Sequence, residues 1–266
     1  MAIVLNEYEW AEKMIHDRNL GSRPTETLNR VAKYYYENRY SKREIRKLLD
    51  QFLVSCDPDA SLFSWSNTLD KITKNAGKYD LVQIDYIPVT QNELNAISAL
   101  GTHLEQRLAF TLLCVSKYWD SISDRNNHWV NSPDKEIFTM ANISISSKRQ
   151  DLLYGKLLEA GLIRQSKKID NLNVQITFCD EFKENPVLLI RDFRNLGHQY
   201  MRFMGGPYFE CVCCGVTTKL TERKVKLRDS RSGTSGRKQK YCPSCAAEIR
   251  MKQNVDAVMR RRKQSK

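Results

Sequence analysis

The chain has 266 residues, of which 41% are hydrophobic and 28% are charged, and its formal net charge is +12. This apolar share is enough for a globular core, which excludes an intrinsically disordered protein. No stretch approaches the roughly 18 apolar residues of a membrane helix, which excludes a transmembrane protein. The start, MAIVLNEYEW, is short and acidic, so no secretory signal is expected. We therefore expect a soluble, intracellular protein of the cytoplasm, with no membrane partner.

The positive charge is confined to the end of the chain. Residues 1–210 hold 27 Lys and Arg against 27 Asp and Glu, whereas residues 211–266 hold 16 against 4. An excess of this density predicts a partner with dense negative charge, usually nucleic acid. The alternative is a solvated basic tail that only aids solubility.

Residues 1–79 have the pattern of a helical module. Apolar residues at helical spacing predict a first helix over about residues 8–15, and Thr25 or Thr27 is a candidate cap for a second. The segment Ser41-Lys-Arg-Glu44 is a capping box, in which each end satisfies a backbone N–H of the other, and it predicts a third helix. A fourth is expected over 62–74. We expect this module to organise a protein partner or a dimer.

The next expected domain, residues 80–184, opens with a strand or extended connector over 80–89, where apolar and polar residues alternate. A second capping box, Thr90-Gln-Asn-Glu93, predicts one or two long helices that continue to about Trp119.

After a polar loop, the pattern alternates between helix and strand. A short helix is predicted over 135–141 and another over 147–160, which Gly161 ends in a left-handed conformation. Strands are expected from Leu162 and from Val174, with a turn at 167–171. The second helix is expected to direct four leucines inward: Leu152, Leu153, Leu157 and Leu158.

The order helix, turn, helix, strand, turn, strand over residues 126–182 resembles a winged helix, and so does the segment SKRQDLLYGKLLEAGLIRQSKK. The resemblance implies that the second helix enters the major groove of DNA and that the hairpin wing contacts the backbone or minor groove. The implied contacts are Ser147, Lys148, Arg149, Gln150 and Lys156 on the helix and Arg164, Lys167 and Lys168 on the wing. The alternative is a winged helix that serves protein contacts.

Two cysteine pairs near the end of the chain predict a metal site. Cys211 and Cys214 form one Cys-x2-Cys pair, and Cys242 and Cys245 form the other. A tetrahedral ion needs four ligands, and each pair delivers two sulfurs from one tight turn. We expect one structural Zn²⁺, because four thiolates close the coordination shell and leave no position for water. A redox dithiol pair and disulfides are the alternatives.

The cysteine module resembles a zinc ribbon. It also resembles the tails "CxxCG … YCxxCAxEIRR" of phage and mobile-element proteins. The matching residues are Cys211, Cys214, Gly215, Tyr241, Cys242, Cys245, Ala246, Glu248, Ile249 and Arg250. Cys213 departs from that pattern. It is a further sulfur that could replace Cys211 or Cys214 as a ligand, so the register of the first pair stays open.

Basic residues surround and follow these pairs. The segment between the pairs predicts an exposed tip, and the residues after Cys245 predict a basic helix. Such side chains contact phosphate and give affinity without reading sequence. The candidates are Arg223, Lys224, Lys226, Arg228, Arg237, Lys238, Lys240, Arg250, Arg260, Arg261 and Arg262.

The sequence therefore predicts a mainly α fold in four parts: a helical module (1–79), a helical region with an α+β winged helix (80–184), a linker region (185–209) and a basic zinc ribbon with a C-terminal helix (210–266). The favoured function is DNA binding in replication or transcription control. RNA binding and a protein-interaction adaptor or inhibitor of a nucleic-acid enzyme are the alternatives. No ATPase, hydrolase or protease motif occurs, so we expect no enzyme, with a nuclease of unrecognised carboxylates as the remaining rival.

Overall fold

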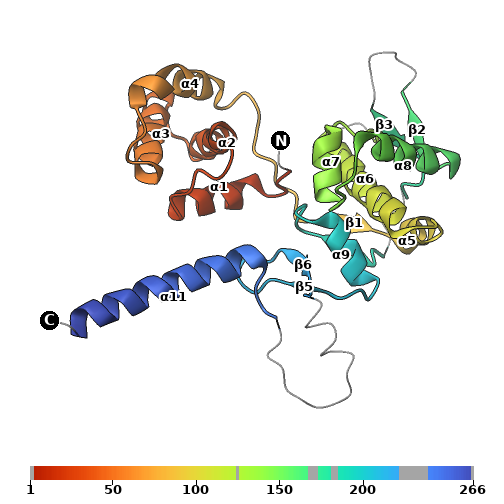
Figure 1. The fold of residues 1–266 in the computed structure, drawn as a ribbon. Helices are drawn as coiled ribbons and strands as arrows, with labels where there is room; N and C mark the ends of the chain where they lie inside the picture. The colour runs from red at the N-terminus through yellow and green to blue at the C-terminus, as the bar shows by residue number, and fades with distance from the viewer. Residues whose placement is uncertain (1–2, 124–125, 167–172, 181–184, 222–238, 265–266) are drawn as a thin grey trace. The chain divides into compact units, whose positions relative to one another are not determined.

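The structure is a computed structural model, and it describes residues 3–123, 126–166, 173–180, 185–221 and 239–264. The chain divides into two compact units, Met1–Ile87 and Pro88–Lys266 (Figure 1). Helices make up most of both units, and the strands form two-stranded sheets. The expected mainly helical fold is thus confirmed. Within the described residues, no helix combines the length and the apolar character needed to cross a membrane.

The first unit consists of helices packed around one apolar core. They are α1 (Glu7–His16), α2 (Pro24–Glu37), α3 (Lys42–Cys56) and α4 (Leu62–Asn75). Helix α2 is central, since it contacts α1, α3 and α4. The core contains Leu28, Val31, Ile45, Leu49, Phe52, Leu53 and Leu69. Removing this apolar surface from water stabilises the unit by roughly 25 cal/mol per Å².

The helix starts of this unit follow from the local sequence, with one correction. The capping box at Ser41 forms, since the Ser41 hydroxyl accepts from the Glu44 N–H at 3.3 Å and the Glu44 carboxylate accepts from the Ser41 N–H at 2.8 Å. Helix α2, however, begins at Pro24, whose fixed φ suits the first helical position. The expected caps Thr25 and Thr27 therefore lie inside the helix, and the Thr27 hydroxyl donates to the Leu20 carbonyl instead.

The second unit is built around the long helix α6 (His103–Ile122), whose residues from Leu108 to Tyr118 are buried. It packs against α5 (Gln91–Ser98), α7 (Asp134–Met140), α8 (Ser147–Glu159) and α9 (Leu196–Phe203). The capping box at Thr90 forms as expected. A third capping box at Thr102 separates α5 from α6, which resolves the expected long helical region into two helices.

The strands of this unit are short. Only Ile87–Val89 of the expected extended segment forms a strand, β1, and it pairs with β4 (Leu188–Ile190). Strand β2 (Ile163–Gln165) pairs antiparallel with β3 (Val174–Ile176), with Arg164 opposite Gln175. Gly161 ends α8 at φ +71°, as the sequence indicates. The turn expected at 167–171 lies outside the described residues.

Two expectations for this unit differ from the structure. Leu153 and Leu157 of α8 are buried, but Leu152 and Leu158 are 61% and 42% exposed, because a helix directs only one stripe into the core. The region 185–209, expected to be a linker, contains β4 and α9, and Leu196 and Tyr200 are fully buried.

The close approach of α9 to α7 depends on a glycine. A Cβ on Gly197 would lie 2.0 Å from the carbonyl oxygen of Ala141, the residue that follows α7. Any side chain at this position would push α9 away from the core. This tight packing makes the segment part of the folded unit.

Candidate metal centre and nucleic-acid surface

The first cysteine pair lies in the loop of a β-hairpin. Strands β5 (Tyr208–Glu210) and β6 (Thr217–Lys219) pair antiparallel, with Glu210 opposite Thr217. The loop is held closed by a hydrogen bond from the Cys211 N–H to the Val216 carbonyl at 3.0 Å and by one from the Gly215 N–H to the Cys211 carbonyl at 2.8 Å. Gly215 has φ +73°, a conformation that a residue with a side chain rarely adopts. The Cys-x2-Cys-Gly sequence therefore produces a tight turn with both sulfurs on one side.

The second pair lies at the start of a helix. Cys242 immediately precedes α11 (Pro243–Gln264), and its carbonyl accepts the Ala246 N–H at 2.9 Å. Proline at the first helical position favours a helix start at this point. The two pairs thus come from a hairpin loop and a helix end, so the structure does not confirm the expected zinc ribbon in its detail.

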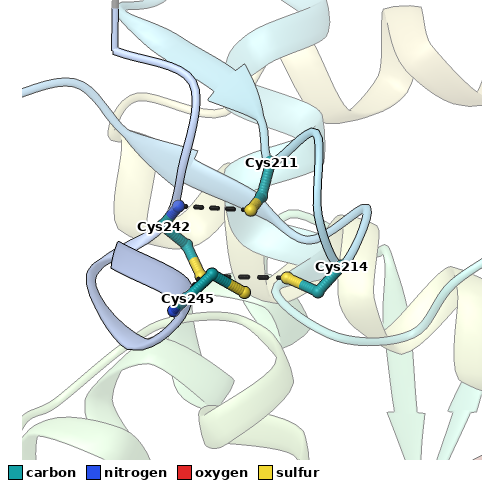
Figure 2. Close-up of side chains that lie close together, drawn as sticks. All are labelled: Cys211, Cys214, Cys242 and Cys245. Atoms are coloured by element: carbon teal, nitrogen blue, oxygen red, sulfur yellow. Dashed lines mark hydrogen bonds between the residues drawn. The ribbon is translucent and has the colours of Figure 1, made fainter. Parts of the chain in front are cut away.

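The four thiols converge on one point (Figure 2). The sulfurs of Cys211, Cys214, Cys242 and Cys245 all lie within 4.8 Å of one another. All but Cys214 are buried, and together the four form the core of this module. Cys213 is exposed and lies outside the cluster, which favours Cys211 and Cys214 as the first pair. All eight cysteines of the chain are free thiols in the structure.

Backbone N–H groups point at these sulfurs. The Cys242 N–H donates to the Cys211 sulfur at 3.2 Å, and the Cys245 N–H donates to the Cys242 sulfur at 3.5 Å (Figure 2). Burial acts to raise the pKa of the Cys211 thiol, but backbone N–H groups, foremost that of Cys242, outweigh it and lower the pKa to about 6. The thiolate, the form that binds metal, is therefore favoured at Cys211. Burial raises the pKa of the Cys214 thiol, and the neighbouring Cys214 sulfur is the main cause that raises the pKa of Cys245.

The geometry fits a single tetrahedral ion. Metal–sulfur bonds of about 2.3 Å in a tetrahedron separate the sulfurs by about 3.8 Å. The Cys214 and Cys242 sulfurs are 3.7 Å apart. Four thiolates suit zinc or iron and close the shell. The four cysteines can thus hold one metal ion in a structural role.

Side chains from the region before α9 hold the hairpin in place. Arg194 donates to the Cys214 carbonyl at 2.8 Å while its guanidinium pairs with Asp192 at 2.6 Å. The Asn195 side-chain amide donates to the Thr217 carbonyl at 3.0 Å. These residues lie in the region that was expected to be a linker, so their role was not predicted. The spacing of Leu196, Tyr200 and Phe203, at i, i+4 and i+7, is the signal that could have predicted the helix beside them.

The expected nucleic-acid residues of α8 and the wing occupy different environments. Ser147, Lys148 and Arg149 are exposed in the first turn of α8, and Arg164 is exposed on β2. Gln150 is half-buried and donates to the Ile145 carbonyl at 3.3 Å. Lys156 forms an ion pair with Glu105 of α6 at 2.7 Å, so its charge is already partly neutralised.

The basic residues of the last segment are only partly described. Lys240, Arg250 and Arg260 are exposed. From Met251 to Arg260 every residue of α11 is exposed, so this part of the helix buries no face within the described chain. The remaining candidates lie outside the residues, or the side chains, that the structure describes: Lys167, Lys168, Arg223, Lys224, Lys226, Arg228, Arg237, Lys238, Arg261 and Arg262.

Comparison of the chain with models of protein families, with curated proteins and with solved structures finds no match. The residues and their geometry therefore carry the functional argument. They establish a mainly helical protein with a four-cysteine cluster able to bind one metal ion.

Proposed function

We propose that the protein is a zinc-containing DNA-binding protein that acts in replication or transcription control. One observation carries this proposal: the four-thiol centre lies in residues 211–266, the segment that holds the whole net charge of +12. A closed set of four thiolates organises structure and does no chemistry of its own. Its role is then to fold a basic module whose partner is a polyanion.

The choice of DNA rests on the second unit. Helices α7 and α8 and the β2–β3 hairpin follow the order of a winged helix, and an isolated bridge between Trp129 and Gln175 adds a third strand position beside the hairpin. In that arrangement the first turn of the second helix reaches the major groove. The exposure of Lys148 and Arg149 supports this role, since both are long donors at the position where base edges and phosphates lie.

The zinc assignment and the biological setting complete the proposal. Zinc is favoured over iron because two Cys-x2-Cys pairs that close one tetrahedron are typical of structural zinc sites. A phage or mobile-element setting rests only on the resemblance of the tail around Cys211–Gly215 and Tyr241–Arg250.

A salt titration of duplex DNA binding tests the proposal. The double variant Lys148→Ala, Arg149→Ala should weaken binding at least about tenfold and reduce the salt slope by about one to two, because each phosphate contact contributes about 0.9 to the slope. Lys135→Ala is the matched control, since Lys135 is an exposed lysine of the neighbouring helix α7. Unchanged affinity in the double variant would overturn the role of α8. Equal or tighter binding of structured RNA at the same salt would favour an RNA-binding factor instead.

One observation favours a protein-interaction adaptor as the second candidate. Leu152 and Leu158 of α8 are 61% and 42% exposed, and apolar exposure on a helix is typical of a protein contact. If the wild type and the Lys148→Ala, Arg149→Ala variant bind duplex DNA equally weakly, the adaptor replaces the favoured function.

A further inference from the structure

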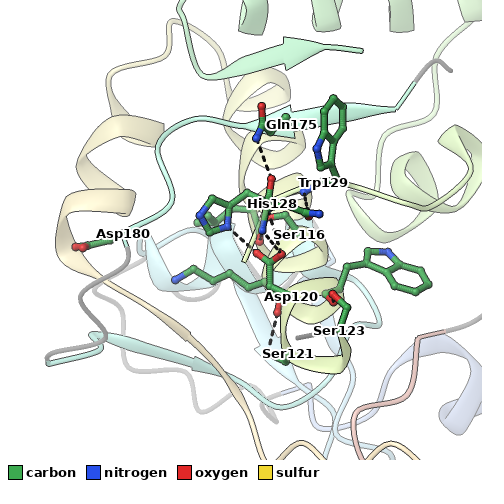
Figure 3. A network of polar contacts seen from close by, with 12 residues as sticks. Ser116, Asp120, Ser121, Ser123, His128, Trp129, Gln175 and Asp180 are labelled. Atoms are coloured by element: carbon green, nitrogen blue, oxygen red, sulfur yellow. Dashed lines mark hydrogen bonds and ion pairs between the residues drawn. The ribbon is translucent and has the colours of Figure 1, made fainter. Parts of the chain in front are cut away.

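A histidine–carboxylate pair joins the end of α6 to the segment that follows it (Figure 3). The Asp120 carboxylate lies 2.6 Å from the His128 Nδ1 and also accepts the backbone N–H groups of Asn127 and His128, both at 3.1 Å. His128 has φ +55°, a left-handed conformation that is uncommon outside glycine. Uncommon backbone conformations of this kind persist where the surroundings hold them, and they cluster at functional sites. Asp120 thus holds the His128 ring in a fixed orientation.

The pair leaves one ring nitrogen for a ligand. Because Asp120 is a carboxylate, the neutral ring places its proton on Nδ1 and keeps a lone pair on Nε2. The ring lines a cavity of about 460 Å³, a size within the range of roughly 300–1,000 Å³ that is typical of small-molecule sites. Other side chains that line it include Lys117, Asp120, Ser121, Asn126, Cys179 and Asp180. Nε2 is therefore a hydrogen-bond acceptor at the wall of an open cavity.

The charged side chains that the structure describes around the cavity already have partners. Lys117 is the cation among the lining residues that the structure describes, but the Lys117 ammonium lies 2.6 Å from the buried Glu93 carboxylate and donates to the Pro88 carbonyl at 2.7 Å. Its charge is thus neutralised inside the protein. The Asp120 carboxylate is paired with His128, and the Asp180 carboxylate accepts from the Thr90 hydroxyl at 3.1 Å, so both place oxygen acceptors on the wall to which a ligand with hydrogen-bond donors can bind.

Cys179 contributes a neutral thiol to the wall of the cavity. Burial is the main cause that raises the pKa of its thiol to about 12, so the sulfur is neutral near pH 7. A neutral thiol is a small apolar surface and not a nucleophile. The cavity therefore combines an apolar patch, a lone-pair acceptor and the amide of Asn126, a side-chain type that can pair with adenine through donor and acceptor together.

We propose that this cavity binds an unpaired nucleobase with an exocyclic amino group, adenine or cytosine, and that the His128 Nε2 accepts a hydrogen bond from that group. Proteins read unpaired bases in this way, by hydrogen bonds to the base edge inside a cavity, with the phosphates outside. The identity of the natural ligand rests on the proposed nucleic-acid function, whereas the cavity and its acceptor do not. The site is separate from the exposed first turn of α8.

Calorimetric titration of the full chain with free nucleosides tests this site. Adenosine and cytidine should bind saturably, and at least about tenfold more tightly than inosine and uridine, because these carry a carbonyl oxygen where the amino group would be and leave the acceptor unpaired.

The variant His128→Asn provides the matched test of the acceptor. Asparagine adopts the left-handed conformation readily, so the backbone is kept while the ring is removed. This variant should lose at least about tenfold in affinity for adenosine, whereas His16→Asn, a change at an exposed histidine of the other unit, should lose none. Ring ¹⁵N NMR should also show the His128 Nε2 resonance shifting on addition of adenosine.

Several results would overturn the site. The site is overturned if no nucleoside binds saturably, if inosine and adenosine bind with equal affinity, or if His128→Asn binds adenosine as tightly as the wild type does. It is also overturned if spermidine, a cation without a ring, fully displaces adenosine. Duplex DNA binding that still depends on Lys148 and Arg149 would then leave the proposed function standing. If nucleoside binding is found but DNA binding does not depend on Lys148 and Arg149, the nucleoside site stands and the proposed role of α8 falls.

Discussion

The two ends of the chain are folded by opposite means. The first unit closes around apolar side chains of four packed helices, with Leu28, Ile45, Leu49 and Leu69 fully buried. The cysteine module has a core of sulfur atoms and little else, and its helix α11 is exposed from Met251 onward. A module with so little apolar surface cannot offset the conformational entropy of folding without a further constraint. The comparison indicates that a metal ion held by the four thiols would take the place of a hydrophobic core.

Removal of the metal should therefore produce the largest effect, and only at one end. Cys245→Ser should reduce the metal content from about one ion per chain to near zero, because structural zinc supplies on the order of 10 kcal/mol of folding free energy. Amide hydrogen exchange should rise in the β5–β6 hairpin and in the first turn of α11, with no change in α1–α4. Element analysis together with exchange mass spectrometry measures both.

The control for this experiment is the residue directly before the candidate ligand Cys214. Cys213→Ser changes an exposed thiol outside the cluster, so metal content and exchange should stay as in the wild type. A wild-type preparation without metal, or equal metal loss in Cys213→Ser, would contradict the four-cysteine assignment.

The second-largest effect on stability is expected from a substitution that creates a cavity in the apolar core of the first unit. Leu49→Ala removes a fully buried side chain and should lower the free energy of unfolding by about 2–5 kcal/mol. Thermal unfolding monitored by circular dichroism measures the change, and the metal content should not alter. Loss of metal in this variant would show that the two regions do not fold independently.

The sequence predicted these two regions unequally well, for a physical reason. Cysteine spacing encodes a metal site directly, because two sulfurs three residues apart reach one ion from a single turn. The pairs of Cys211 and Cys242 were therefore identified with their correct partners. A helix after the second pair was also expected, whereas its start at Pro243, directly after Cys242, is not revealed by the cysteine spacing.

The regions that sequence reasoning missed depend on tertiary contacts. Asp120 and His128 lie eight positions apart across the end of a helix, a spacing that no motif encodes. Arg194 meets the Cys214 carbonyl only because α9 packs on α6 and brings the segment before it to the hairpin. Leu152 and Leu158 were expected to be buried because apolar residues on both sides of a helix look alike in sequence, and only packing selects Leu153 and Leu157.

Helix-capping residues should each contribute about 1 kcal/mol to the free energy of unfolding. This is less than the contribution of the apolar core of the first unit or of the metal centre. Ser41→Ala removes the cap of α3, whose hydroxyl accepts the Glu44 N–H, and typically costs about 1 kcal/mol. Ser41→Asp is the matched variant, since aspartate also caps a helix and should retain most of the stability. Urea unfolding of the full chain, followed through the first unit, measures the difference. Equal destabilisation by both substitutions would mean that the box is not the source of the effect.

The smallest effect is expected at an ion pair of the second unit, where it also varies with pH. The hydrogen bond from Lys156 is the main cause that lowers the pKa of Glu105, which is buried in the first turn of α6. A lowered pKa stabilises the fold above the unfolded pKa of about 4.3, and this contribution is lost as the pH falls through the folded pKa. Because the Lys156 side chain is 56% exposed, solvent screens the pair, and Lys156→Gln should cost less than about 1 kcal/mol at pH 7.

The difference in free energy of unfolding between the wild type and Lys156→Gln should shrink as the solution is acidified, because the protonated Glu105 no longer attracts the lysine. Unfolding of the wild type and of Lys156→Gln at pH 7 and near pH 3 measures it, with Lys135→Gln as the control for loss of an exposed lysine. A difference that stays constant with pH would mean that Lys156 acts through the packing of its aliphatic stem against α6. The same variant should also lose less DNA affinity than the Lys148→Ala, Arg149→Ala variant, since a lysine paired with Glu105 has less charge to offer to phosphate.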